Sequence, residues 1–172
     1  MNNAAFDAIE KTWALTIKAR ALCPYTDASM IGQAGYISPP WYRTRGAVYF
    51  VNLAKPLTSV DVHELNQIGS FVNRSFVISM AAVLEEHHVV RPSPDHPIQG
   101  GDHVQLTIWL RNRFAHGEWE YNADEANHVE TRTLLERLFP RGAAGGSGFV
   151  LSIDSILEPL KDGVLQYIRA AT

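Results

Sequence analysis

The sequence has little cysteine, no long apolar run and no spacing typical of a metal or nucleotide site. Each of these absences excludes a class of protein. The chain holds one cysteine, Cys23, in 172 residues, which excludes an intrachain disulfide and favours a reducing cytosol. Nothing beside Cys23 activates its thiol, so we interpret it as a small buried hydrophobe rather than a nucleophile.

Long apolar runs and targeting signals are also missing. No run approaches the ~20 apolar residues that a membrane span needs. The first residues, MNNAAFDAIEKTW, lack the basic flank and apolar block of a signal peptide. We therefore expect a cytoplasmic protein with no membrane partner.

Spacings typical of metal or nucleotide sites are absent as well. None of the seven histidines forms a His-x-x-x-His pair, and a lone cysteine cannot supply a zinc-finger pattern. The adjacent His87 and His88 point about 100° apart on a helix. The Gly-rich stretch 142–148 lacks the Gly-Lys-Ser/Thr ending of a phosphate loop, so we expect 141–148 to be a flexible Gly/Ala turn. The sequence predicts no metal and no cofactor. Surface or satisfied-core positions are the better interpretation for His63, His87, His88, His96, His103 and His128.

The overall balance is that of an ordinary globular protein. Hydrophobic residues make up 46% and charged residues 19%, which predicts a single domain over residues 1–172. A net charge of −3 excludes a basic nucleic-acid coat, so any RNA site must be local. Five arginines lie in 111–141 and could form such a local site, namely Arg111, Arg113, Arg132, Arg137 and Arg141. The alternative, that most of them are solvated helix charges, stays open.

Hydrophobic periodicity predicts an all-α fold of five helices. Residues 59–88 carry two apolar stripes, one from Val62 to Val83 and one at Ile68, Phe71 and Ile78, which predicts a central helix buried on more than one side. We expect Ser59 and Asp102 to cap their helices, and Pro159 to kink or restart the last one. The expected helices are 3–22, 59–88, 102–116, one after the cap at 122–125 that stops at Pro140, and 152–169.

The stretch 24–58 does not follow a helical pattern. It is rich in Gly, Pro and aromatic residues, and 47–51 is a β-branched and aromatic run that favours a short strand. We expect an irregular insertion after the first helix that can include such a strand. Its aromatic residues Trp41, Tyr42 and Tyr49 either cap the core or stack unpaired bases.

The richest chemistry lies in Arg111-Asn112-Arg113-Phe114-Ala115-His116-Gly117. Arg111 is a permanent cation suited to phosphate, and His116 is the residue type that moves protons near neutral pH. Asn112 and His116 are four apart and share a helix face. If the helix stops near Gly117, unsatisfied carbonyl groups favour a protonated His116.

With its surroundings, LTIWLRNRFAHGEW followed by HVETRTLLERLFP, this motif resembles the HEPN superfamily of helical bundles. The resemblance rests on Arg111, on Asn112 directly after it, and on His116, which is separated from Arg111 by four residues. It is tightest over about 102–140 and does not extend to 23–57. It implies an antiparallel bundle of four to five helices, metal-independent RNA cleavage in many members, and nucleotide binding without catalysis in others.

The resemblance makes Arg111, Asn112 and His116 the expected catalytic residues of an endoribonuclease of the toxin or phage-defence type. Arg113 and Glu118 are the expected substrate-binding residues, although Arg113 can simply face water and Glu118 can be a solvated carboxylate. Some HEPN toxins carry a modified Tyr two residues after the His, where this chain has Glu118. We also expect a homodimer with a composite site, because in-line cleavage profits from both a base and an acid while one chain offers a single motif histidine, and the resemblance agrees with this. Trp109 and Trp119 flank the motif and are the candidates for the contact rim. The toxin type further implies an antitoxin or regulatory partner. The alternatives are a non-catalytic nucleotide- or RNA-binding module and a structural dimerisation bundle.

Overall fold

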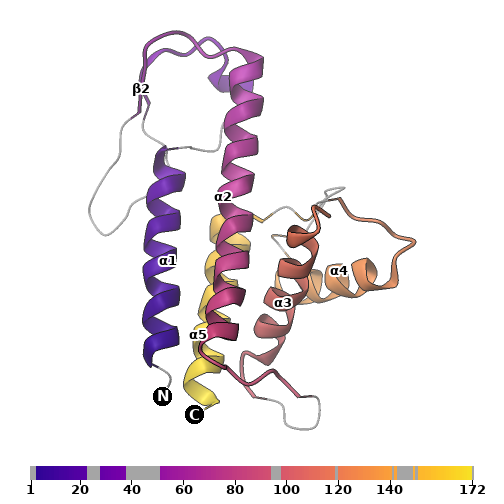
Figure 1. The fold of residues 1–172 in the computed structure, drawn as a ribbon. Coiled ribbons are helices and arrows are strands. Elements are labelled where there is room, and N and C mark those ends of the chain that lie inside the picture. The colour runs from indigo at the N-terminus through magenta and orange to yellow at the C-terminus, as the bar shows by residue number, and fades with distance from the viewer. Residues whose placement is uncertain are drawn as a thin grey trace. The chain divides into compact units, whose positions relative to one another are not determined.

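The computed structural model describes residues 3–22, 28–37, 51–93, 98–118, 120–140, 142, 149 and 151–171. Over these residues the chain is mostly helical, as expected from its periodicity (Figure 1). The predictions for Cys23, Trp41, Tyr42, Tyr49, Trp119, Arg141 and nearly all of 141–148 lie outside the described residues. The elements are α1 (Asn3–Leu22), a 3₁₀ turn η1 (Ala28–Met30), β1 (Gly35–Ile37), β2 (Val51–Leu53), α2 (Ser59–Glu86), α3 (Gly101–Ala115), α4 (Ala126–Leu138), a π-helical turn η2 (Ile153–Leu157) and α5 (Glu158–Ala170).

The chain forms two compact units. One combines Met1–Thr12 with Asn73–Thr172, and the other is Trp13–Val72. Both α1 and α2 contribute residues to each unit. The single-domain prediction is not tested by this division and stays a prediction.

The unit Trp13–Val72 holds the irregular insertion. Strands β1 and β2 pair antiparallel, with Tyr36 opposite Asn52, so the insertion does contain a short β-ladder. The strand predicted at 47–51 overlaps the observed one only at Val51, because 47–50 lie outside the described residues.

Thr58, not Ser59, caps the start of α2. The Thr58 backbone N–H and hydroxyl both donate to Asp61 Oδ2, at 2.7 and 2.6 Å, and the Asp61 N–H donates back to Thr58 Oγ1 at 3.2 Å. This reciprocal arrangement satisfies N–H groups that the first helical turn leaves free. The hydrogen bond from the Thr58 hydroxyl lowers the pKa of Asp61, because it stabilises the ionised carboxylate. The prediction of Ser59 was one residue late.

A close approach between α1 and α2 depends on Gly69. Arg20 is 1% exposed, and a Cβ added at Gly69 would overlap its guanidinium group. Within the described residues, Arg20 Nε and Nη1 find no hydrogen-bond partner. The buried arginine therefore occupies the space that a side chain at position 69 would need.

The expectation that both apolar stripes of α2 are buried was wrong. Phe76 and Met80 of the first stripe are buried, but Ile68 and Phe71 of the second are 45% and 61% exposed. Among the described residues, α2 is the one helix long and apolar enough to cross a membrane by length and composition. The core helix of a soluble protein meets the same criterion, so this finding does not assign α2 to a membrane.

The core of the larger unit lies where α3 packs against α5. Leu106 and Leu110 of α3 are fully buried, as are Leu160 and Val164 of α5. The helices approach closely at Gly163, where a Cβ would overlap the His103 ring. Val104 is buried and Ala115 is exposed, so the buried side of α3 runs through Leu106, Leu110 and Phe114.

The last helix changes from π-helical to α-helical at Glu158, next to Pro159, which fits the restart among the two alternatives predicted there. The π-helical turn η2 ends at Leu157, whose N–H donates to Ser152 O at 2.9 Å, and Pro159 then lies in the first turn of α5. Proline is tolerated there because the first N–H groups of a helix have no intrahelical acceptor. Apolar residues at helical spacing are buried along this segment, namely Ile153, Leu157, Leu160, Val164 and Ile168.

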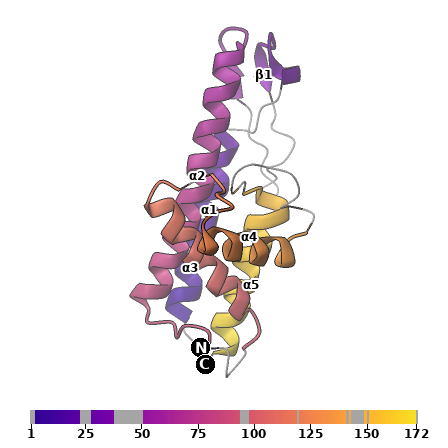
Figure 2. The same ribbon diagram turned by 90° about the vertical axis from the view of Figure 1, so that its right-hand side faces the viewer.

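Two other predicted caps differ in the structure. The N-cap of α3 is Gly100 at φ 85°, whereas Asp102 pairs with Arg137 of α4 at 2.7 Å. Helix α4 begins at Ala126, after Glu125, and the Asn122 side chain organises the preceding turn by accepting the Asp124 N–H and donating to Glu125. In both views the axis of α4 is turned sideways relative to that of α5, and α4 packs against α3 (Figures 1 and 2).

Candidate functional site

The motif helix α3 ends in a tight turn at Gly117. Gly117 has φ 74°, its N–H donates to Phe114 O at 3.2 Å, and the Glu118 N–H donates to Arg113 O at 2.9 Å. This pair of bonds is a Schellman motif, which needs a left-handed residue and therefore favours glycine. The stop predicted near Gly117 is confirmed. The Schellman motif occupies the carbonyl groups of Arg113 and Phe114. These two carbonyls are therefore not the unsatisfied groups that we expected to favour a protonated His116.

Arg111, Asn112 and His116 all lie at this end of α3 and are accessible. Asn112 and His116 are exposed, and the Arg111 side chain is 33% exposed. Arg111 Nη1 donates to Asn112 Oδ1 at 3.0 Å. His116 is tied to this segment through its backbone, since its N–H donates to Arg113 O at 3.1 Å and Asn112 O at 3.3 Å. The structure thus joins the side chains of Arg111 and Asn112 and leaves the His116 imidazole facing solvent one turn on.

Arg111 has a second acceptor, which the sequence did not indicate. Its Nη2 donates to Glu85 Oε2 at 2.7 Å, from the last turn of α2. The Glu85 side chain is 46% exposed, so the pair lies at the surface. Glu85 is 26 positions before Arg111. No local pattern links two residues that far apart, so sequence reasoning missed it.

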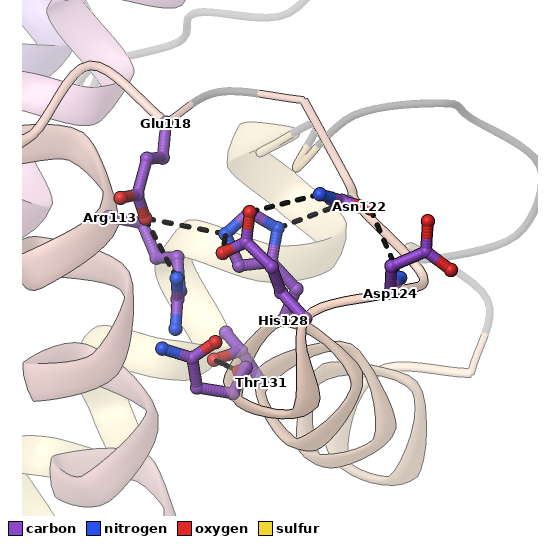
Figure 3. A network of polar contacts seen from close by, with 8 residues as sticks. Arg113, Glu118, Asn122, Asp124, His128 and Thr131 are labelled. Atoms are coloured by element: carbon purple, nitrogen blue, oxygen red, sulfur yellow. Dashed lines mark hydrogen bonds and ion pairs between the residues drawn. The ribbon is translucent and has the colours of Figure 1, made fainter.

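Arg113 lies on the other side of α3 and is buried at 7% exposure. Its Nη1 donates to Glu118 Oε2 at 2.7 Å, across the Gly117 turn (Figure 3). Its Nε is buried and has no hydrogen-bond partner within the described residues. Burial contradicts the alternative that Arg113 faces water. The structure brings the two expected substrate-binding residues together, but as partners of each other. Their binding role stays a prediction that this burial does not favour.

The same Glu118 oxygen also contacts His128 of α4, at 3.3 Å from Nε2 (Figure 3). His128 is 3% exposed, and its Nε2 lies 3.2 Å from Glu125 Oε2. On the other side of the ring, the Asn122 N–H donates to Nδ1 at 3.0 Å. His128 is therefore a satisfied core histidine, one of the two alternatives predicted for it, and it joins the end of α3 to the start of α4.

Glu118, Glu125 and His128 also form a potential metal-ligand set, with donor atoms within 4.8 Å of one another. Two contacts make this set a poor fit for an ion. Because His128 Nδ1 accepts the Asn122 N–H, the proton of the neutral ring sits on Nε2, which then has no lone pair for a metal. Arg113 already supplies a positive charge to the Glu118 oxygen that an ion would need. We therefore assign Glu118, Glu125 and His128 a structural role in stabilising the turn at Gly117.

The ionisation of Glu118 follows from these contacts. The hydrogen bond from Arg113, then that from His128, lowers its pKa below the ordinary value of 4.5, because both donors stabilise the carboxylate. Glu118 is therefore charged at neutral pH, beside the buried guanidinium of Arg113.

Arg132 and Arg137, both on α4, each form an ion pair. Arg137 reaches Asp102 with its side chain 62% exposed, and Arg132 pairs with Glu136 on its own helix. The Arg132 guanidinium also lies 5.8 Å from the centre of the Tyr121 ring. Solvated helix charges, the alternative left open above, describe Arg137 well. Arg132 is partly covered.

A pocket of about 470 Å³ lies at the opposite end of α3 from the motif. Its lining includes Pro92, Gly100, Asp102, His103 and Leu138. Burial lowers the pKa of His103, because its charged form loses solvation. The Asp102 carboxylate sits in the first turn, where an anion would otherwise bind, so the pocket is a poor anion site.

No protein-family model matches the chain, and neither the curated proteins nor the solved structures contain a significant match.

Proposed function

We propose that the chain is a HEPN-like, metal-independent endoribonuclease whose active residues are Arg111, Asn112 and His116. One observation carries this proposal. A cation, an amide and an imidazole are gathered at one solvent-accessible helix end, with Arg111 and Asn112 already hydrogen-bonded at 3.0 Å. The mostly helical fold and the turn at Gly117 are compatible with the resemblance of the motif.

The reaction is attack of an RNA 2′-hydroxyl on the adjacent phosphorus. A bond forms between O2′ and phosphorus while the bond from phosphorus to O5′ breaks, giving a 2′,3′-cyclic phosphate and a free 5′-hydroxyl. The 2′-hydroxyl loses a proton to a base and O5′ gains one from an acid. His116 serves in this proton transfer, which typically contributes 10²–10⁴-fold to the rate. Arg111 neutralises charge that grows on the phosphate oxygens, and Asn112 holds Arg111 or the phosphate.

The working unit in this proposal is a symmetric homodimer. One chain offers a single motif histidine, whereas in-line cleavage benefits from both a base and an acid. A two-fold interface brings each His116 and Arg111 to its copy, because an isologous contact uses the same patch twice. Trp109, which is half-buried, remains a candidate for the contact rim. We further propose a cytoplasmic toxin or phage-defence role, with an antitoxin or regulatory partner that restrains cleavage.

A non-catalytic nucleotide- or RNA-binding module is the second candidate. The Glu85 pair is compatible with it, because an arginine held by a carboxylate and an amide can bind a phosphate through its other N–H groups without taking part in a reaction. RNA cleavage separates the two candidates. A structural dimerisation bundle would neither cut RNA nor melt at a higher temperature when nucleotide is added.

The decisive experiment compares His116→Ala and Arg111→Ala with the wild-type chain on labelled RNA. Both side chains are accessible, so each substitution should abolish cleavage and leave the circular dichroism spectrum unchanged. His63→Ala and Arg137→Ala are matched controls, because both residues are exposed and lie outside the motif. Wild-type cleavage by His116→Ala would remove the histidine from the mechanism.

A further inference from the structure

The guanidinium of Arg111 is held from two sides by groups on different helices. Asn112 Oδ1 accepts from Nη1 at 3.0 Å, and Glu85 Oε2 accepts from Nη2 at 2.7 Å. Asn112 belongs to α3, whereas Glu85 belongs to the last turn of α2. The two terminal nitrogens are thus fixed separately, which sets both the position of the group and the rotation of its plane.

Buried neighbours anchor both ends of this contact. Leu84, directly before Glu85, is 4% exposed, and Leu110, directly before Arg111, is 0% exposed. The backbones that carry the two charged residues are therefore held by the core, although the side chains reach solvent. Since a long arginine side chain loses considerable rotamer freedom when it is ordered, a contact that orders it in advance removes that cost from the binding step.

The contact leaves Arg111 able to bind a phosphate. A guanidinium has five N–H donors, and among the described residues these two hydrogen bonds occupy two of them, so three remain for a ligand. The side chain is 33% exposed, in contrast to the 8% of Arg113. Arg111 is therefore the motif arginine that combines a fixed orientation with access for a ligand.

We propose that Glu85 is a positioning residue, which orients the Arg111 guanidinium toward the scissile phosphate. This inference rests on the proposed function. Glu85 acts through Arg111 and does not touch the reacting atoms. It also cancels the charge of Arg111, so its removal should leave RNA attraction equal or stronger while the orientation is lost. The expected signature is a lower kcat with an unchanged or lower KM. The folded fraction of each variant has to be measured beside it, because a loss of folded protein also lowers the apparent kcat at an unchanged KM.

The test uses the full chain with Glu85→Gln, which keeps the shape and removes the charge. Glu86→Gln is the matched control, because it makes the same change at an exposed position one residue further along α2. We expect Glu85→Gln to lower kcat about 10-fold at saturating RNA. Removing a group that orients a functional side chain, such as the partner of a metal ligand, typically has an effect of this size. Glu86→Gln should leave kcat and KM unchanged, and Glu85→Asp should restore part of the rate.

A double-mutant cycle makes the coupling specific. If Glu85 acts through Arg111, adding Glu85→Gln to Arg111→Lys, which keeps the charge and so leaves a rate to measure, should lower the rate by less than it does in the wild type. Thermal melting of each variant reports whether a lost rate reflects lost fold. Equal or faster cleavage by Glu85→Gln in an active wild-type background would overturn the role of Glu85 alone. A wild-type chain that cleaves no RNA would overturn the proposed function, and this inference with it.

Discussion

Arg113 and Glu118 form an ion pair of 2.7 Å that spans the turn at which α3 ends. The Glu118 N–H also donates to the Arg113 carbonyl, at 2.9 Å, so backbone and side chain join the same two residues. His128 extends this link to α4 through the same carboxylate oxygen. The turn that carries His116 is therefore held by contacts to the next helix, which fixes the backbone of the candidate site.

Replacing Arg113 should destabilise the protein. Arg113→Ala removes a guanidinium whose side chain is 8% exposed and leaves Glu118 without its main partner. Breaking a buried pair costs several kcal/mol, but the Glu118 side chain is 40% exposed, so we expect a loss of about 2 kcal/mol. Urea unfolding measures the difference. Arg137→Ala, at an exposed pair, should change the free energy of unfolding by less than about 0.5 kcal/mol, and an equally small change for Arg113→Ala would contradict the structural role.

The stability of the protein should depend on the ionisation of Glu118. Its pKa in the folded state is lowered below 4.5 by Arg113 and His128. A lowered folded-state pKa stabilises the fold above the unfolded value, and this contribution is lost as the pH falls through the folded value. The gap in unfolding free energy between wild type and Glu118→Gln should therefore be largest above pH 4.5 and shrink below it. Glu130→Gln, at an exposed position of α4, is the control. A gap that does not change with pH would exclude this linkage.

Cleavage should need no metal ion. The proposed chemistry uses a histidine, an arginine and the 2′-hydroxyl of the substrate, so full activity should persist in excess EDTA. DNA of the same sequence should survive, because it lacks the attacking hydroxyl. Both results are read from labelled oligonucleotides on a denaturing gel. Cutting of the DNA strand, or complete loss of RNA cleavage in EDTA, would refute the mechanism.

Activity should depend on association of two chains. If the site combines His116 and Arg111 from both copies, activity per chain should fall on dilution in parallel with the dimer fraction. Sedimentation and RNA cleavage measured over one dilution series give both quantities. A mixture of His116→Ala and Arg111→Ala chains supplies a second reading, because heterodimers would regain one copy of each residue. Undiminished activity in a monomeric sample would rule the composite site out.

The sequence by itself determined the features that depend on neighbours in the chain. Gly117 ends α3 because a left-handed residue closes the Schellman turn, and Pro159 lies in the first turn of α5, where its missing N–H costs no hydrogen bond. The buried stripe of α5 follows from its helical spacing. The location of Arg111, Asn112 and His116 at one helix end could be predicted for the same reason.

Only the tertiary structure decided which partners those residues have. Arg111 and Arg113 are two positions apart, about 200° around a helix, so they face different surroundings. One meets Glu85 of α2 at the surface, and the other is buried with Glu118 beside His128 of α4. Likewise Ile68 and Phe71 fit an apolar stripe yet are exposed, and Gly69 is needed because Arg20 fills the space beside it. Periodicity places a residue on a face of its helix, but only the packing of the helices decides what that face meets.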